Sequence, residues 1–249
     1  MTVSSYREVH LGKGQDYHDK FQQQPYLSLI WRLEREALLA LVLEEMTQPA
    51  DVRYLDFACG TGRVVGALEE IVGNAVGVDL SPSMLEIAKT HLRRTELVCA
   101  DITTDPVALT GRRFDLITAF RFFPNAEIGL RDSAMGALTA LLAPRGRMIV
   151  NNHRRRVNLR WLLRSFLNLF RRKKKDLHTM SDREMRDLAA HHGLSIAKTR
   201  HFGVWPVLKE SKPFLSIPAL EAFERWASRR SCFASIASHK IYVLVRSNE

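Results

Sequence analysis

From residue 53 onward, short apolar runs alternate with segments of helical periodicity, and this alternation constrains the fold more than any other feature of the sequence. The predicted strands are Arg53–Cys59, Ala75–Leu80, Thr95–Ile102, Phe114–Phe123, Arg147–Asn152, Leu194–Val204 and His239–Arg246. The predicted helices between them are Arg63–Val72, Pro82–Leu92, Asn125–Leu142, Ser181–His192 and Ala219–Arg229. Alternating strands and helices predict an α/β fold, a doubly wound and mostly parallel sheet whose ligands bind beyond the carboxyl ends of the strands.

A helical region of about 50 residues precedes this pattern, with one long predicted helix at Tyr26–Met46. The length of 249 residues fits a single domain, 1–249. No apolar run reaches the ~18–20 residues of a membrane span, and the N-terminus lacks a secretory signal pattern. The three cysteines, Cys59, Cys99 and Cys232, are too scattered for a disulfide framework. These features predict a cytoplasmic protein.

Glycines and carboxylates follow the first three predicted strands. Gly60 and Gly62 lie between the first strand and its helix, where glycine lets the backbone approach a ligand closely. The second strand ends in Asp79, a position from which a carboxylate can accept both hydroxyls of a ribose. The third strand ends at Asp101, which is either a second ligand contact or an aspartate that stabilises a turn. The sequence therefore predicts a nucleoside site at this edge of the sheet.

These residues resemble the motifs of the class I S-adenosylmethionine-dependent methyltransferases. The segment Asp56–Gly62 is similar to their first motif, and Val76–Leu85 is similar to the segment that follows it. The later motifs of the family resemble Ala100–Ile102, Phe114–Ile117 and Leu142–Gly146, in the same order and spacing. The resemblance covers about residues 50–152. It implies a seven-stranded Rossmann-like methyltransferase fold in which residues 1–50 form a helical lid region.

The resemblance also implies S-adenosylmethionine as the cofactor and assigns residues to its parts. Asp56 would face the amino group of the methionine moiety, and the rest of the loop would wrap that moiety with Ala58, Cys59, Gly60 and Gly62. Asp79 would hold the ribose. The adenine would contact Leu80, Met84, Asp101 and Ile102, and Phe120 would border the sulfonium. A dinucleotide is the competing cofactor, because Gly60-x-Gly62-x-x-x-Gly66 approximates its fingerprint, but Asp56 would then place a negative charge beside a pyrophosphate.

The methyl acceptor should lie over the ends of the fourth and fifth strands. The fourth strand ends without the Asn/Asp-Pro-Pro-aromatic tetrad of enzymes that methylate nucleic-acid amino groups. Three residues are candidates for catalysis: Arg121 as an anion clamp, His153 as a general base for a hydroxyl, and Tyr17 as a lid aromatic near the methyl group. Each has a structural alternative, as a surface arginine, a hydrogen-bonded rim histidine or a packing tyrosine. No ligand spacing predicts a metal site.

The excess positive charge belongs to one segment. The chain has 37 basic and 27 acidic residues, a net charge of +10, and residues 154–175 hold ten basic and no acidic side chains. Within the insertion at 154–180, leucines and phenylalanines recur at helical spacing, which predicts an amphipathic helix. Three interpretations remain open: an interfacial helix on an anionic membrane, a cap over the acceptor pocket, or a nucleic-acid-binding segment.

Together these features predict a methyltransferase that acts on a small-molecule or lipid-linked acceptor, and we expect a hydroxyl as the methylated group. A peripheral position on the inner face of the membrane follows if the basic helix inserts. The alternatives are an RNA methyltransferase and an inactive scaffold that binds cofactor and recruits a partner through the basic helix. The sequence does not predict an oligomeric state.

Overall fold

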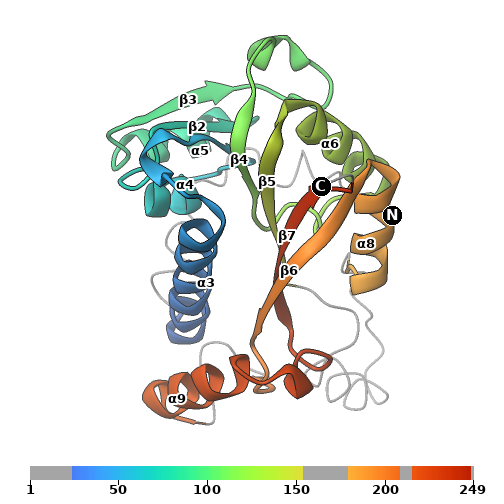
Figure 1. Ribbon diagram of the computed structural model, residues 1–249. Helices are drawn as coiled ribbons and strands as arrows, with labels where there is room; N and C mark the ends of the chain where they lie inside the picture. Colours follow the sequence, from blue (N-terminus) through green and yellow to red (C-terminus); the bar gives the residue numbers. More distant parts are fainter. Residues whose placement is uncertain (1–23, 154–178, 208–214, 248–249) are drawn as a thin grey trace, which may run out of the picture.

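The centre of the molecule is a seven-stranded sheet in the order β3-β2-β1-β4-β5-β7-β6 (Figure 1). The computed structural model describes residues 24–153, 179–207 and 215–247. The strands are β1 (Arg53–Phe57), β2 (Asn74–Asp79), β3 (Thr95–Cys99), β4 (Phe114–Ala119), β5 (Leu142–Asn152), β6 (Leu194–Phe202) and β7 (His239–Arg246). Neighbours from β3 to β5 are parallel, whereas β7 runs antiparallel to both β5 and β6. The predicted fold class is confirmed.

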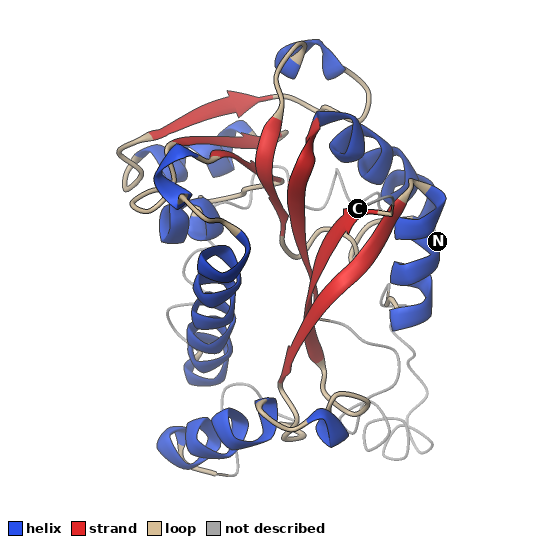
Figure 2. Cartoon of the chain, in the orientation of Figure 1, coloured by secondary structure: helices blue, strands red, loops and turns tan. Residues whose placement is uncertain are grey.

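Helices cover both faces of the sheet (Figure 2). They are α3 (Pro25–Glu45), α4 (Arg63–Leu68), α5 (Pro82–Lys89), α6 (Ile128–Leu141), α8 (Asp182–His191) and α9 (Ile217–Ser228). The core divides into two large clusters because successive strand residues face opposite sides. Ile117 belongs to the cluster that includes α6 and α8, whereas its neighbour Leu116 belongs to the cluster that includes α3 and α4. The long N-terminal helix therefore packs on the same face as the helix that follows the glycine loop.

Several boundaries differ from the predicted ones. β3 ends at Cys99 and β4 at Ala119, so Asp101 and Phe120 lie in the loops that follow rather than in the strands. β5 begins at Leu142 instead of Arg147, and the residues predicted as a turn at 144–146 lie within it, at a shift in its register with β4. α4 ends at Leu68 rather than Val72. An added Cβ at Gly73 would lie 2.3 Å from the carbonyl oxygen of Ala50, which explains a glycine there.

The helix caps show how local sequence sets these elements. Ser181 and Glu184 form the predicted capping box at the start of α8. Ser81 is the N-cap residue of α5, but its hydroxyl contacts that of Ser83 and makes no capping bond. Its backbone N–H instead donates to the Asp79 carboxylate at 2.9 Å. The start of α5 is thus held by the carboxylate predicted to bind the ribose.

Two predicted features lie outside the described residues. One is the lid segment that contains Tyr17, and the other is the amphipathic helix within 154–175, which stay predictions. In the parts of the chain that the structure describes, no helix is both long and apolar enough to span a membrane.

Candidate active site

The loop after β1 has an unusual backbone. Gly60 and Gly62 have φ values of 55° and 77°, and Ala58 has a φ of 53°. Among the described residues, Ala58 and Arg121 are the two non-glycine residues with positive φ, and both follow the carboxyl end of a central strand. Backbone strain of this kind is concentrated at functional sites, because the surrounding structure must hold it in place.

The two glycines of this loop serve different purposes. A Cβ added to Gly62 would lie 2.7 Å from Cδ1 of Leu92, so this glycine allows close packing against the region after α5. A Cβ added to Gly60 would meet no atom within 4 Å. The space beside Gly60 is therefore open, as expected where a ligand approaches the backbone.

Asp79, at the end of β2, links its strand to the glycine loop. One carboxylate oxygen accepts the backbone N–H of Gly60 at 2.8 Å, and the other accepts the N–H of Ser81. Because β1 and β2 are parallel and adjacent, both residues lie at the same sheet edge. The structure thus brings together two of the predicted cofactor-binding residues.

The predicted adenine contacts lie around the ends of β2 and β3. Met84 and Ile102 are buried, at 3% and 2% exposed, whereas Leu80 and Asp101 are partly exposed. Asp101 accepts hydrogen bonds from the backbone N–H and the hydroxyl of Thr103. This is the turn-stabilising role that the sequence left open. Its part in adenine binding stays a proposal.

Asp56 is buried under the loop. Its carboxylate accepts a hydrogen bond from the Thr118 hydroxyl at 2.5 Å and from the backbone N–H of Val65, in the first turns of α4, at 3.1 Å. The Tyr54 hydroxyl in turn contacts the Thr118 hydroxyl. Burial raises the pKa of Asp56 to about 7, although the bonds from Thr118 and Val65 oppose the shift. Asp56 therefore ties β1, β4 and α4 together and changes charge near neutral pH.

The residues after β4 are held by a buried carboxylate that the sequence pattern did not predict. Glu34, on α3, is fully buried and accepts a hydrogen bond from the Asn151 side chain. Its second oxygen lies 3.5 Å from Nη2 of Arg121. The Arg121 backbone N–H donates to Asn151, and its carbonyl accepts from the Asn125 side chain. Arg121, predicted as an anion clamp, is thus paired with a carboxylate of the N-terminal helix, while Phe120 packs in the core beside it.

His153 follows β5 at the same edge and is partly exposed. Its ring lies 6.5 Å from that of His239, the first residue of β7, which stacks on Phe202. The His239 ring also contacts the Ser238 hydroxyl at 2.8 Å. The structure places His153 beyond the carboxyl end of β5, as predicted, with the imidazole of His239 nearby.

Two further features were not predicted. The guanidinium of Arg63, the first residue of α4, lies 4.2 Å from the centre of the Trp31 ring on α3, a cation–π contact between the glycine-loop helix and the N-terminal helix.

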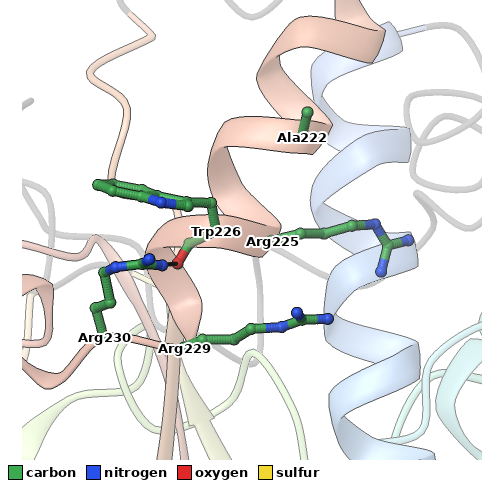
Figure 3. Close-up of a pocket in the computed structure, with 5 residues that line it drawn as sticks. All are labelled: Ala222, Arg225, Trp226, Arg229 and Arg230. Carbon is green, nitrogen blue, oxygen red and sulfur yellow. Dashed lines mark hydrogen bonds between the residues drawn. The ribbon is translucent and has the colours of Figure 1, made fainter.

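A hollow on α9 is lined by Ala222, Arg225, Trp226, Arg229 and Arg230 (Figure 3). Figure 3 shows Arg225 and Arg229 directed toward α3, with Trp226 and Arg230 on the other side of α9. The hollow includes no residue of the glycine loop.

The fold and the loop geometry agree with the class predicted from the motifs, the class I S-adenosylmethionine-dependent methyltransferases. A family model described as a methyltransferase domain matches residues 49–199. The chain belongs to this methyltransferase domain family. The matched region contains the glycine loop, Asp79, Asp101 and the ends of β4 and β5.

Individual relatives show the range of acceptors around this chain. It is 30% identical over 150 residues to a dTDP-3-amino-3,6-dideoxy-alpha-D-glucopyranose N,N-dimethyltransferase from Streptomyces fradiae, covering 58% of this chain and 50% of that protein. It is 29% identical over 104 residues to a ubiquinone biosynthesis O-methyltransferase from Brucella melitensis, covering 40% of each. The chain thus spans half or less of these relatives.

A solved structure extends the likeness to nearly the whole fold. Magnesium protoporphyrin IX methyltransferase from Synechocystis PCC 6803, solved with bound SAH, superposes with a TM-score of 0.69. The superposition covers 97% of this chain and 98% of that one, at 14% identity. At this identity the likeness establishes the fold, and the three relatives together include N- and O-methylating enzymes by name.

Proposed function

We propose that this protein transfers the methyl group of S-adenosylmethionine to a hydroxyl of a small-molecule acceptor, with His153 as the general base. The observation that carries the acceptor side of the proposal is the position of His153. It lies partly exposed at the end of β5, two strands from the glycine loop in the sheet order. An acceptor bound there would face the cofactor edge.

The residues around the loop fit the proposed cofactor. The open space beside Gly60 admits the methionine moiety, and the Asp79 carboxylate at the end of β2 is suited to the ribose hydroxyls. The buried side chains of Met84 and Ile102 offer apolar surface to an adenine ring. Asp56, with a pKa of about 7, supplies a carboxylate for the amino group directly or through water.

When bound, S-adenosylmethionine supplies an electrophilic methyl group on a sulfonium, and displacement at that carbon needs alignment and exclusion of water more than side-chain chemistry. Phe120, which is 6% exposed, contributes an apolar wall at the end of β4. Asn151, which donates to Glu34, accepts the backbone N–H of Arg121 and so holds the positive-φ backbone that follows β4. His153 accepts the proton that the acceptor hydroxyl loses.

The relatives support a small acceptor without selecting the atom, since one name describes an amino sugar and the other an O-methyltransferase of ubiquinone biosynthesis. A hydroxyl acceptor requires a group that takes a proton at neutral pH, and imidazole is the side chain suited to that task. An amine acceptor that binds in its neutral form does not need this base. The presence of a histidine at the end of β5 therefore favours a hydroxyl acceptor over an amine.

The test is tritiated-methyl labelling of cell extract fractionated into small molecules and RNA, followed by the assay of matched hydroxyl and amine acceptors. We expect labelled methyl ethers, and we expect the variant His153→Gln to lower kcat at neutral pH while the cofactor binds with unchanged affinity. His91→Gln, an exposed histidine after α5, is the matched control. Labelled amines, or a His153→Gln enzyme with wild-type kcat, would contradict the proposal. Label found in RNA would favour the nucleic-acid alternative.

A further inference from the structure

Away from the glycine loop, two helices bring three potential metal ligands together. Asp132 lies on α6, His191 is the last residue of α8, and His192 is the C-cap residue that follows. Their ligand atoms all lie within 4.8 Å of one another. His192 lies 60 residues after Asp132 in the sequence, and His191 directly precedes it. Because of this separation, the ligand spacing in the sequence did not predict the cluster.

His192 is already oriented toward the carboxylate. Its Nε2 lies 2.9 Å from Oδ1 of Asp132, and its side chain is 17% exposed. The ring rests on α6 at Gly136, where an added Cβ would lie 3.2 Å from Cε1 and 3.5 Å from Nδ1. Gly136 thus leaves room for the ring against α6, where Nε2 contacts Asp132.

His191 completes the cluster from the exposed side. Its Nε2 lies 4.0 Å from the same oxygen of Asp132, and its side chain is 72% exposed, so the ring is free to turn inward. Zinc binds imidazole nitrogen at about 2.0–2.1 Å, so two ligands of a tetrahedral site lie about 3.3–3.4 Å apart. Because the ligand atoms lie within 4.8 Å of one another, the widest separation must close by no more than about 1.5 Å, shared between two side chains. The position at the carboxyl end of α8 also favours a cation, because the helix dipole is negative there.

We propose that Asp132, His191 and His192 form a site for a divalent transition-metal ion of the zinc or nickel class. The bound ion would link the carboxyl end of α8 to α6. Two imidazoles and one carboxylate suit Zn²⁺, Ni²⁺ or Cu²⁺, whereas Mg²⁺ prefers an all-oxygen set. Water fills the remaining positions. The site is separate from the methyl-transfer edge, so it does not depend on the proposed function.

The test uses the full chain without a polyhistidine tag, stripped of metal with a chelator and titrated calorimetrically with ZnCl₂, NiCl₂ and MgCl₂. We expect one Zn²⁺ and one Ni²⁺ per chain, and no comparable binding of Mg²⁺. His191→Ala and Asp132→Asn should each weaken Zn²⁺ and Ni²⁺ binding about tenfold or more. Both side chains are more than half exposed, so these variants should fold normally.

His91→Ala, which removes an exposed histidine outside the cluster, should bind both metals as the wild type does. In addition, Zn²⁺ should raise the thermal midpoint of the wild type and leave that of His191→Ala unchanged, since a ligand that binds only the folded state stabilises it. Zn²⁺ and Ni²⁺ binding that survives in both cluster variants would overturn the proposal and place the metal elsewhere, for example on the exposed thiols of Cys99 and Cys232. Equal affinity for Mg²⁺ would overturn the assigned metal class.

Discussion

The fully buried carboxylate of Glu34, on the N-terminal helix, lies 3.5 Å from the guanidinium of Arg121 at the end of β4. The same carboxylate accepts a hydrogen bond from Asn151 near the end of β5. A single side chain of α3 therefore joins the two strand ends over which the acceptor is proposed to bind. The helix is part of the site's framework, not only a cover for the sheet.

Removal of this carboxylate should be costly. We expect Glu34→Ala to lower the free energy of unfolding by about 3–5 kcal/mol, because a largely buried arginine loses its charged partner. Glu36→Ala on the same helix is the control, since its ion pair with Arg225 is about half exposed and contributes less than about 1 kcal/mol. Urea denaturation of both variants measures the difference. Equal losses would mean that the buried pair contributes nothing beyond a surface one.

A substitution at Gly60 in the glycine loop can test whether a ligand approaches the backbone there without disturbing side-chain packing. Gly60→Ala and Gly111→Ala both place a side chain at positive φ with no atom within 4 Å, so each should cost only about 1–2 kcal/mol of stability. Only Gly60→Ala should weaken S-adenosylmethionine binding, by about tenfold or more, because its methyl group occupies the proposed ligand space. Calorimetric titration of the two variants compares them. Unchanged affinity in Gly60→Ala would remove the ligand from this side of the loop.

Asp56 should make stability depend on pH. Its pKa is about 7 in the folded protein and near 3.8 in an unfolded chain, so the folded state holds the proton more tightly. Stability should therefore fall as pH rises from about 4 to about 7 and change no further above that. Relative to Asp56→Asn, we expect the wild type to lose roughly 2–3 kcal/mol between pH 5 and pH 8. Urea titrations at the two pH values measure this, and a parallel response of both proteins would contradict it.

A second buried carboxylate holds the segment after β6. Glu224, on α9, accepts the backbone N–H groups of Gly203, Val204 and Trp205 at 2.7–3.0 Å. We expect Glu224→Ala to cost at least about 2 kcal/mol, since each buried donor left without an acceptor costs about 1–3 kcal/mol. Glu221→Ala, on the same helix and partly exposed, should cost less. Thermal unfolding of the two variants tests this, and a larger loss in Glu221→Ala would refute it.

The strands and helices of the described residues were predictable because their periodicity and turn residues are local signals. The capping box of Ser181 and the glycines after β1 follow directly from sequence. The ends of β3 and β4 were placed too late, because apolar residues such as Phe120 and Ile102 continue past the last ladder bonds into the core. The early start of β5 was missed because Pro144 and Gly146 signal a turn, which the structure accommodates as a shift in register with β4.

The meeting of Gly60 and Asp79 at one edge of the sheet was likewise predictable, since Gly60 lies in the loop after β1 and Asp79 ends β2. The partners of Arg121 were not. Glu34 lies within a helical pattern where a glutamate normally faces solvent, and only the packing of α3 on the sheet reveals that it is buried. Pairings between residues distant in sequence, such as Asp132 with His192, depend on how two helices meet and leave no local signal.

The central claim is that Asp79 and the glycine loop bind S-adenosylmethionine, and calorimetric titration of that compound tests it most directly. The wild type should bind one molecule per chain, and Asp79→Ala should lose binding. Asp115→Ala should retain it, because that carboxylate lies near the start of β4, paired with Arg53 at the opposite edge of the sheet. Absence of binding by the wild type, or equal binding by Asp79→Ala, would contradict the account.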